Sequence, residues 1–191
     1  MRISQNGIKK NINPPTDQWQ AAYTSLSTAI ELVPNHPDYL ETMASLYHWQ
    51  VLLQERQPHQ ITESLNLSKD FYQQAIKLRP AWPFSWANFA LIKQQLNELD
   101  EEYNHAIERA VTLGAWESKL QNIVTQATLP SWQQLNKDTQ NLVVENSFRA
   151  LHSNAREFIA IAKQHNMLTI LCGKFKRDEL VKKACSDKQF R

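Results

Sequence analysis

AIELVPNHPDYLETMA (Ala29–Ala44) and AIKLRPAWPFSWANFA (Ala75–Ala90) repeat one pattern at a distance of 46 residues. Both stretches begin with Ala-Ile, carry Leu at the fourth position and Pro at the sixth and ninth, and end on Ala. A proline disfavours helical backbone in the residue before it, so the first proline of each stretch ends a helix. An apolar run resumes after the second proline. Each stretch therefore predicts a helix end, a tight corner and a new helix.

The residues around each corner identify the helices that it joins. Before the first corner, apolar residues recur at the spacing of one helix face, at Ala22, Leu26, Ala29, Ile30 and Val33. After it, Asp38 is the expected helix cap, with Glu41 as its capping-box partner. Ser85 is the equivalent cap after the second corner.

A weaker third copy, AVTLGAW (Ala110–Trp116), begins 35 residues after the second. This distance is close to the ~34-residue period of tetratricopeptide repeats. The second helix of that repeat carries small and aromatic residues, then Ala and a closing Pro, and three segments resemble it: Ala22–Pro34, Ser68–Pro80 and Tyr103–Ala115. The first helices are expected at Asp38–Leu53 and Ser85–Leu96. The middle unit has eleven extra residues, which predict longer helices or a longer loop.

Composition indicates the same fold class. Only three of the 191 residues are glycine, whereas sheet proteins use glycine at many turns. We expect an all-α protein: an irregular segment over 1–16, a short tetratricopeptide-like array (an α-α superhelix) over 17–116, and a C-terminal helical cap packed on the repeats over 117–191. Within the cap we expect helix starts at Ser131 with Gln134, at Asp138, and at Asn154 with Glu157, a helix end near His165, and a basic helix near 176–184.

Charge and hydropathy exclude some classes of protein. The net charge of +2 is too small to indicate a nucleic-acid partner. The basic tail from Lys174 is expected to be a solvated helix face, with docking on an anionic surface as the alternative. The chain has no run of 18 apolar residues and no signal peptide, and whether Met1 is the native start stays open. Cys172 and Cys185 are compatible with a disulfide or with two buried thiols.

No constellation of residues is typical of catalysis. Three scattered glycines form no phosphate-binding loop, and the six histidines lack metal-ligand spacing. Carboxylates for glycoside hydrolysis are available at Glu41, Glu98–Glu102 and Glu117, but helix capping and the helix dipole are the simpler interpretation. Cys172 lies in an apolar run, which favours an inert thiol. We expect no catalytic residue, no metal and no cofactor.

Aromatic residues gather near the corners. Tryptophan rings stack on sugars, but Trp at helical spacing more often fills the core between repeats, and we expect this for Trp49, Trp82, Trp86 and Trp116. Leu40 and Trp86 are expected to be buried. The groove of the array is the expected partner-binding site, and by helical register its solvent-facing lining is Thr42, Asn88, Leu91, Gln94 and Gln95.

The second corner and the residues after it resemble the VpsP family of bacterial polysaccharide-biosynthesis proteins. The likeness runs over residues 17–172, and its motifs are RPAWPFSWAN (Arg79–Asn88), ELD (Glu98–Asp100), LGAWE (Leu113–Glu117), NHPDYLE (Asn35–Glu41) and Trp132. The resemblance implies a role in exopolysaccharide production, beside glycosyltransferases and export proteins. It also implies an N-terminal membrane segment, which this chain lacks, and it assigns no catalytic residue.

Three hypotheses follow. The first is a non-catalytic protein–protein interaction module, a scaffold that acts with protein partners in bacterial exopolysaccharide biosynthesis or export. It would be associated with the membrane, on the periplasmic or the cytoplasmic face. The second is a generic peptide-binding adaptor or chaperone, and the third is an all-α enzyme that acts on glycans. We favour the first, because the repeat pattern suits extended protein ligands and the family resemblance points to polysaccharide assembly.

Overall fold

The structure is a computed structural model that describes residues 16–53, 57–167, 172, 173, 178, 179 and 182. Within these residues the protein is all-α and has no strand, which confirms the all-α part of the expected fold. Residues 1–15 of the expected irregular segment lie outside the described residues, and so does most of the expected basic helix near 176–184. Thr16, the last residue of that segment, is instead the first residue of α1.

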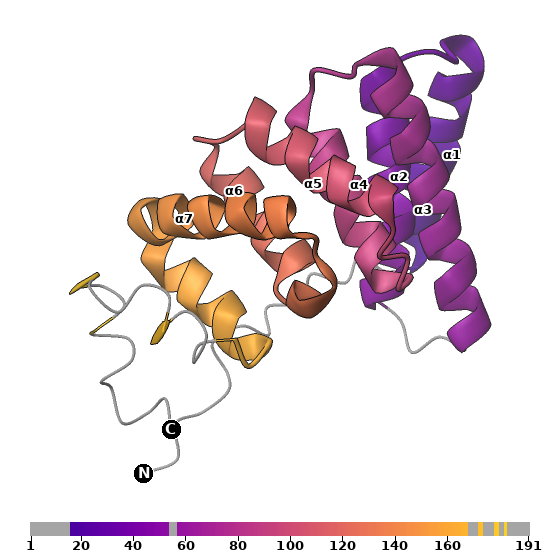
Figure 1. Cartoon of the computed structure of the whole chain (residues 1–191). Coiled ribbons are helices and arrows are strands. Elements are labelled where there is room, and N and C mark those ends of the chain that lie inside the picture. Colours follow the sequence, from indigo (N-terminus) through magenta and orange to yellow (C-terminus); the bar gives the residue numbers. More distant parts are fainter. Residues whose placement is uncertain (1–15, 54–56, 168–171, 174–177, 180–181, 183–191) are drawn as a thin grey trace.

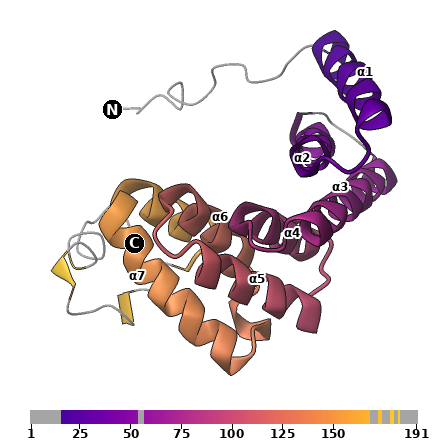
Figure 2. The same cartoon turned by 90° about the horizontal axis from the view of Figure 1, so that it is seen from above.

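Seven α-helices and one short 3-10 helix make up the described fold: α1 (Thr16–Leu32), α2 (Pro37–Leu53), α3 (Pro58–Leu78), α4 (Pro83–Gln95), α5 (Glu101–Leu113), α6 (Ser118–Thr128), η1 (Trp132–Gln134) and α7 (Lys137–Gln164). They follow one another from one end of the molecule to the other (Figure 1). α2 packs on α3, α4 on α5, and α6 on α7, while α4 also contacts α3 and α6. Seen from above, α1 to α3 and α6 to α7 lie at opposite ends (Figure 2).

Three corners share one backbone pattern. Four residues separate α1 from α2, α3 from α4, and α5 from α6. The first N–H of each corner donates to an alanine carbonyl four residues earlier, at 2.9 Å for Ala29, 2.9 Å for Ala75 and 3.0 Å for Ala110. The fourth N–H donates to the first carbonyl of the corner, at 3.3, 3.1 and 3.1 Å. The two proline corners are therefore equivalent, as predicted, and the third copy forms the same corner.

The expected caps after the proline corners are wrong. α2 and α4 each begin with the second proline of the corner, a position that suits proline because its missing N–H would have no helical partner. Asp38 and Ser85 consequently lie inside the first turn. Glu41 does not complete a capping box, because its carboxylate accepts hydrogen bonds from Ser85 and Arg79.

Helix starts in the C-terminal half were predicted with mixed success. The cap of α7 is Asn136, whose side chain accepts from the N–H of Thr139, so the prediction of Asp138 is wrong by two residues. Ser131 directly precedes η1, as predicted, but its side chain makes no capping bond. Its hydroxyl pairs instead with the hydroxyl of Tyr103.

The predicted start at Asn154 is confirmed as a break within α7. The backbone of Asn154 leaves the helical range (φ −152°, ψ 68°), and its side chain bonds both the carboxylate and the N–H of Glu157. The helix ends at Gln164, beside the expected position of His165.

The extra residues of the middle unit lengthen its helices. α2 and α3 contain 17 and 21 residues, whereas α4 and α5 contain 13 each. This agrees with the alternative of extended helices. The additional turns give this unit a longer face than the next one.

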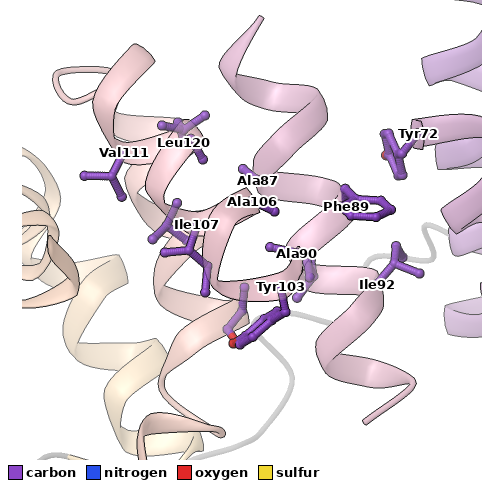
Figure 3. Close-up of a cluster of buried hydrophobic side chains, with 14 of the residues drawn as sticks. Tyr72, Ala87, Phe89, Ala90, Ile92, Tyr103, Ala106, Ile107, Val111 and Leu120 are labelled. Carbon is purple, nitrogen blue, oxygen red and sulfur yellow. The ribbon is translucent and has the colours of Figure 1, made fainter. Parts of the chain in front are cut away.

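The larger of two hydrophobic clusters in the described residues contains buried residues from α2 to α7. Figure 3 shows part of it, with residues labelled from Tyr72 to Leu120. Tyr103 is fully buried in it, and its hydroxyl donates to the carbonyl of Ala127 on α6 at 2.6 Å. Leu40 is buried as expected, outside this cluster. Because Leu120 of α6 and Val143 of α7 belong to the cluster, the C-terminal helices pack directly on the preceding pair.

The tryptophans fill less of the core than expected. Trp116 is 82% exposed, Trp49 48% and Trp82 37%, so the prediction of a core position is wrong for these three. Trp86 is half-buried at the edge of the large cluster, so its predicted burial is only partial. The small residues Ala44 and Ala90 are buried in the core.

Candidate functional site

The residues predicted to line the groove lie on α2 and α4 and differ in exposure. Thr42 and Gln95 are exposed, and Asn88 and Gln94 are half-buried. Leu91 is only 8% exposed and belongs to the large hydrophobic cluster, so its prediction as a solvent-facing lining residue is wrong. The apolar side chain is more stable in the core than on the surface.

Two of the groove side chains are bonded to their own helix. The hydroxyl of Thr42 donates to the carbonyl of Asp38 at 2.6 Å, and the amide of Asn88 donates to the carbonyl of Phe84 at 3.0 Å. Gln95 interacts with His48, which connects α4 to α2. Burial lowers the pKa of His48, and the interaction with Gln95 offsets this only in part.

The acidic residues within Glu98–Glu102 surround a buried lysine, Lys93, which was not predicted as a site residue. The side chain of Lys93 is 3% exposed, and its Nζ lies 2.7 Å from Glu102, 2.9 Å from Asp100 and 3.6 Å from Glu98. Burial alone would lower the pKa of Lys93, but the carboxylates of Glu102 and Asp100 raise it overall. These candidate glycosidase carboxylates are therefore ion-pair partners that join α4 to α5.

A cavity of about 610 Å³ lies between the start of α6 and the first part of α7. We call it the α6–α7 pocket, and its walls are mainly apolar. It is lined by Trp116, Gln121, Val144, Glu145, Phe148, Arg149, His152 and Ser153. The residues from α7 recur at helical spacing, so one face of this helix forms a wall of the pocket.

Charged and aromatic side chains lie next to one another in the α6–α7 pocket. The guanidinium of Arg149 lies 5.4 Å from the centre of the Trp116 ring and forms an ion pair with Glu145 at 3.1 Å. The Nδ1 atom of His152 lies 2.8 Å from the carbonyl of Phe148. Aromatic residues and arginine are enriched in protein interfaces, so this composition suits a partner side chain.

The floor of the pocket is fixed by Gln121. Its Nε2 donates to the carbonyl of Ala115 at 2.8 Å, and its Oε1 accepts from the hydroxyl of Ser153 at 2.6 Å. This pocket was not among the sites predicted from the sequence. The signal was present as Trp116 in the third corner and as Val144, Phe148 and His152 at a spacing of four residues.

Other candidate chemistry is limited in the described residues. Among them, no three His, Cys, Asp or Glu side chains are grouped so that they could hold a metal ion. None of the described helices has the length and apolar character needed to span a membrane. Cys172 is half-buried and disulfide-bonded, which agrees with the disulfide alternative and not with a free thiol. Cys185 and the start of the basic tail at Lys174 lie outside the described residues.

The motif Arg79–Asn88, which carries the resemblance to the VpsP family, forms the second corner and the first turns of α4. No protein-family model matches the chain, and no curated protein sequence matches it. The family assignment therefore stays a proposal.

Proposed function

We propose that this protein is a non-catalytic interaction module built as a short tetratricopeptide-like array. The observation that carries the proposal is the recurrence of one hydrogen-bonded corner, which begins at Val33, Arg79 and Gly114. Equivalent corners relate successive helix pairs in similar ways, and stacked pairs offer a continuous surface to an extended ligand.

The break in α7 extends this pattern. Ala150 precedes Asn154 by four residues, just as Ala110 precedes Gly114 in the third corner. Ala150 and Ala110 are both fully buried. We infer that the kink stands where a fourth corner would begin, and that the C-terminal helices continue the array as a cap.

We propose the surface of α2 and α4 as the groove for protein partners, with Thr42, Asn88, Gln94 and Gln95 as its polar lining. These side chains provide amide and hydroxyl groups for hydrogen bonds to a peptide backbone. The resemblance of Arg79–Asn88 to the VpsP family supports a role in bacterial exopolysaccharide biosynthesis or export. The partners would then be proteins of a membrane-associated assembly machinery.

The test uses cells that carry this gene and make the polymer. Asn88→Glu and Gln95→Glu together place two carboxylates on the groove, and we expect polymer yield to fall while the purified variant keeps the melting temperature of the unmodified protein. Gln74→Glu, on the exposed face of α3, is the matched control and should leave the yield unchanged. Normal polymer yield from the double variant, at normal protein abundance, would exclude the groove.

The same experiment separates the alternatives. Loss of an unrelated cellular activity without any change in polymer would favour a generic adaptor or chaperone. Cleavage or transfer of saccharides by the purified protein, abolished by changing one carboxylate, would instead support a glycan-acting enzyme.

A further inference from the structure

We propose that the α6–α7 pocket binds an aromatic side chain, of the indole type, presented by a partner protein. This inference rests on the proposed function and names the chemistry of one partner contact. It comes from comparing the pocket with the same place in the preceding helix pair, where the chain supplies the aromatic ring itself.

The fourth residues of α4 and α6 are equivalent. They are Trp86 and Gln121, each three residues after the start of its helix. The Nε1 atom of Trp86 donates to the carbonyl of Pro80, and the Nε2 atom of Gln121 donates to the carbonyl of Ala115. Both bonds measure 2.8 Å and both reach back six residues into the corner. Glutamine thus keeps the hydrogen bond of the tryptophan but lacks its ring.

The arginine that lies beside the Trp86 ring has an equivalent in the third helix pair, α6 and α7. The Trp86 ring has the guanidinium of Arg109 at 5.9 Å from its centre. Arg109 lies five residues before Gly114, at the end of α5, and Arg149 lies five residues before the break at Asn154. Arg149 therefore takes the place of Arg109, and it lines the α6–α7 pocket.

Shape and charge favour an aromatic occupant. A glutamine side chain is much smaller than an indole, and the space beside it is open as a cavity of about 610 Å³. Val144, Phe148 and Trp116 give the cavity apolar walls. The guanidinium of Arg149 already has the exposed ring of Trp116 at 5.4 Å from it. An indole from a partner would add a second aromatic ring beside the same guanidinium, a contact that an aliphatic side chain cannot make.

The first measurement is a titration of the full chain with N-acetyl-tryptophanamide, followed by NMR of the methyl groups of Val144. We expect saturable shifts, and about fivefold or more weaker binding of N-acetyl-leucinamide, which cannot form the cation–π contact. No saturable shift with the indole probe, or equal binding of both probes, would overturn the proposal.

Two variants locate the binding. Gln121→Trp supplies an indole from within the chain, as Trp86 does, and should abolish binding of the probe. Trp116→Ala removes an exposed wall and should weaken binding without changing the melting temperature, so it decides the question even if Gln121→Trp does not fold. Lys119→Ala, exposed on α6 and outside the pocket, is the control and should bind normally. Binding that is unchanged in both pocket variants would contradict the assignment.

The outcomes separate this inference from the proposed function. Loss of polymer in the groove variants without indole binding to the purified protein removes the pocket proposal alone. Indole binding that depends on Trp116, together with normal polymer yield in all groove and pocket variants, removes the proposed cellular role alone.

Discussion

The hydroxyl of Ser85 donates a hydrogen bond to the carboxylate of Glu41, so that α4 is bonded directly to α2 across the second corner. The second carboxylate oxygen of Glu41 accepts from the guanidinium of Arg79, within the corner itself, at 3.1 Å. The same guanidinium lies 4.5 Å from the centre of the Trp82 ring. One half-buried carboxylate thus helps to set how the second helix pair meets the first.

Glu41→Ala should therefore destabilise the protein. The hydroxyl of Ser85 is buried and would lose its acceptor, which costs about 1–3 kcal/mol of unfolding free energy. Asp38→Ala is the matched control, because Asp38 pairs with the same Arg79 at 2.8 Å but is 60% exposed, and it should cost no more than about 1 kcal/mol. Urea denaturation measures both losses. Equal losses would show that the Ser85–Glu41 hydrogen bond contributes no more to stability than the exposed Asp38–Arg79 ion pair.

Gly114 permits a close approach at the third corner. A Cβ atom placed there would lie 2.8 Å from Cδ2 of Leu120 and 2.9 Å from Cβ of Pro83. Gly114→Ala should consequently lower the unfolding free energy by about 1–3 kcal/mol, the usual cost of overpacking. The control is Gly173→Ala, where a Cβ would meet no atom within 4 Å. If Gly114→Ala had the same denaturation midpoint as the wild type, α4 and α6 would be able to move apart for the added Cβ atom without a loss of stability.

The corners were predictable because proline acts through local backbone geometry, and the hydrogen bonds of the corner need no distant partner. The caps were not, because proline is equally suited to the first helical position. This moved each helix start ahead of Asp38 or Ser85. Glu41 therefore does not cap α2 and accepts a hydrogen bond from Ser85, a residue 44 positions away. A pattern of neighbouring residues does not predict a contact between residues so far apart in the sequence.

The candidate site was harder to predict for a related reason. Helical register places Leu91 on the same face as Asn88, but only packing against neighbouring helices shows that Leu91 is buried. At the α6–α7 pocket, Gln121 is smaller than Trp86, the residue at the equivalent position of α4. Aligning the third copy with the second by corner would have paired Gln121 with Trp86 and indicated the missing ring.

Half-buried His48 predicts a pH dependence of stability. Its pKa is lowered from 6.5 by burial, so the folded protein binds a proton less readily than the unfolded chain. The corresponding stability is present above about pH 6.5 and is lost as the pH falls towards the lowered pKa of the folded state. His48→Gln should therefore show a smaller loss of unfolding free energy between about pH 7 and pH 5. His59→Gln, exposed on α3, is the control for the substitution, and a wild-type pH profile in His48→Gln would contradict the prediction.

The ion pair between Lys93 and Asp100 predicts a second loss of stability at acidic pH. Here the group that takes up the proton is a carboxylate and not a histidine. Burial alone would raise the pKa of Asp100, but hydrogen bonds from Lys93 and from the N–H of Tyr103 lower it overall from 3.8. A carboxyl group with a lowered pKa in the folded state stabilises the protein above its unfolded pKa, and this stability is lost as the pH falls through the folded value. Asp100→Asn should therefore be less stable than the unmodified protein near neutral pH, and the difference should shrink below about pH 4. Urea titrations of both proteins across this range measure it. A stability difference that stays constant at all pH values would show that Asp100 acts through its shape as the cap of α5 and not through its charge.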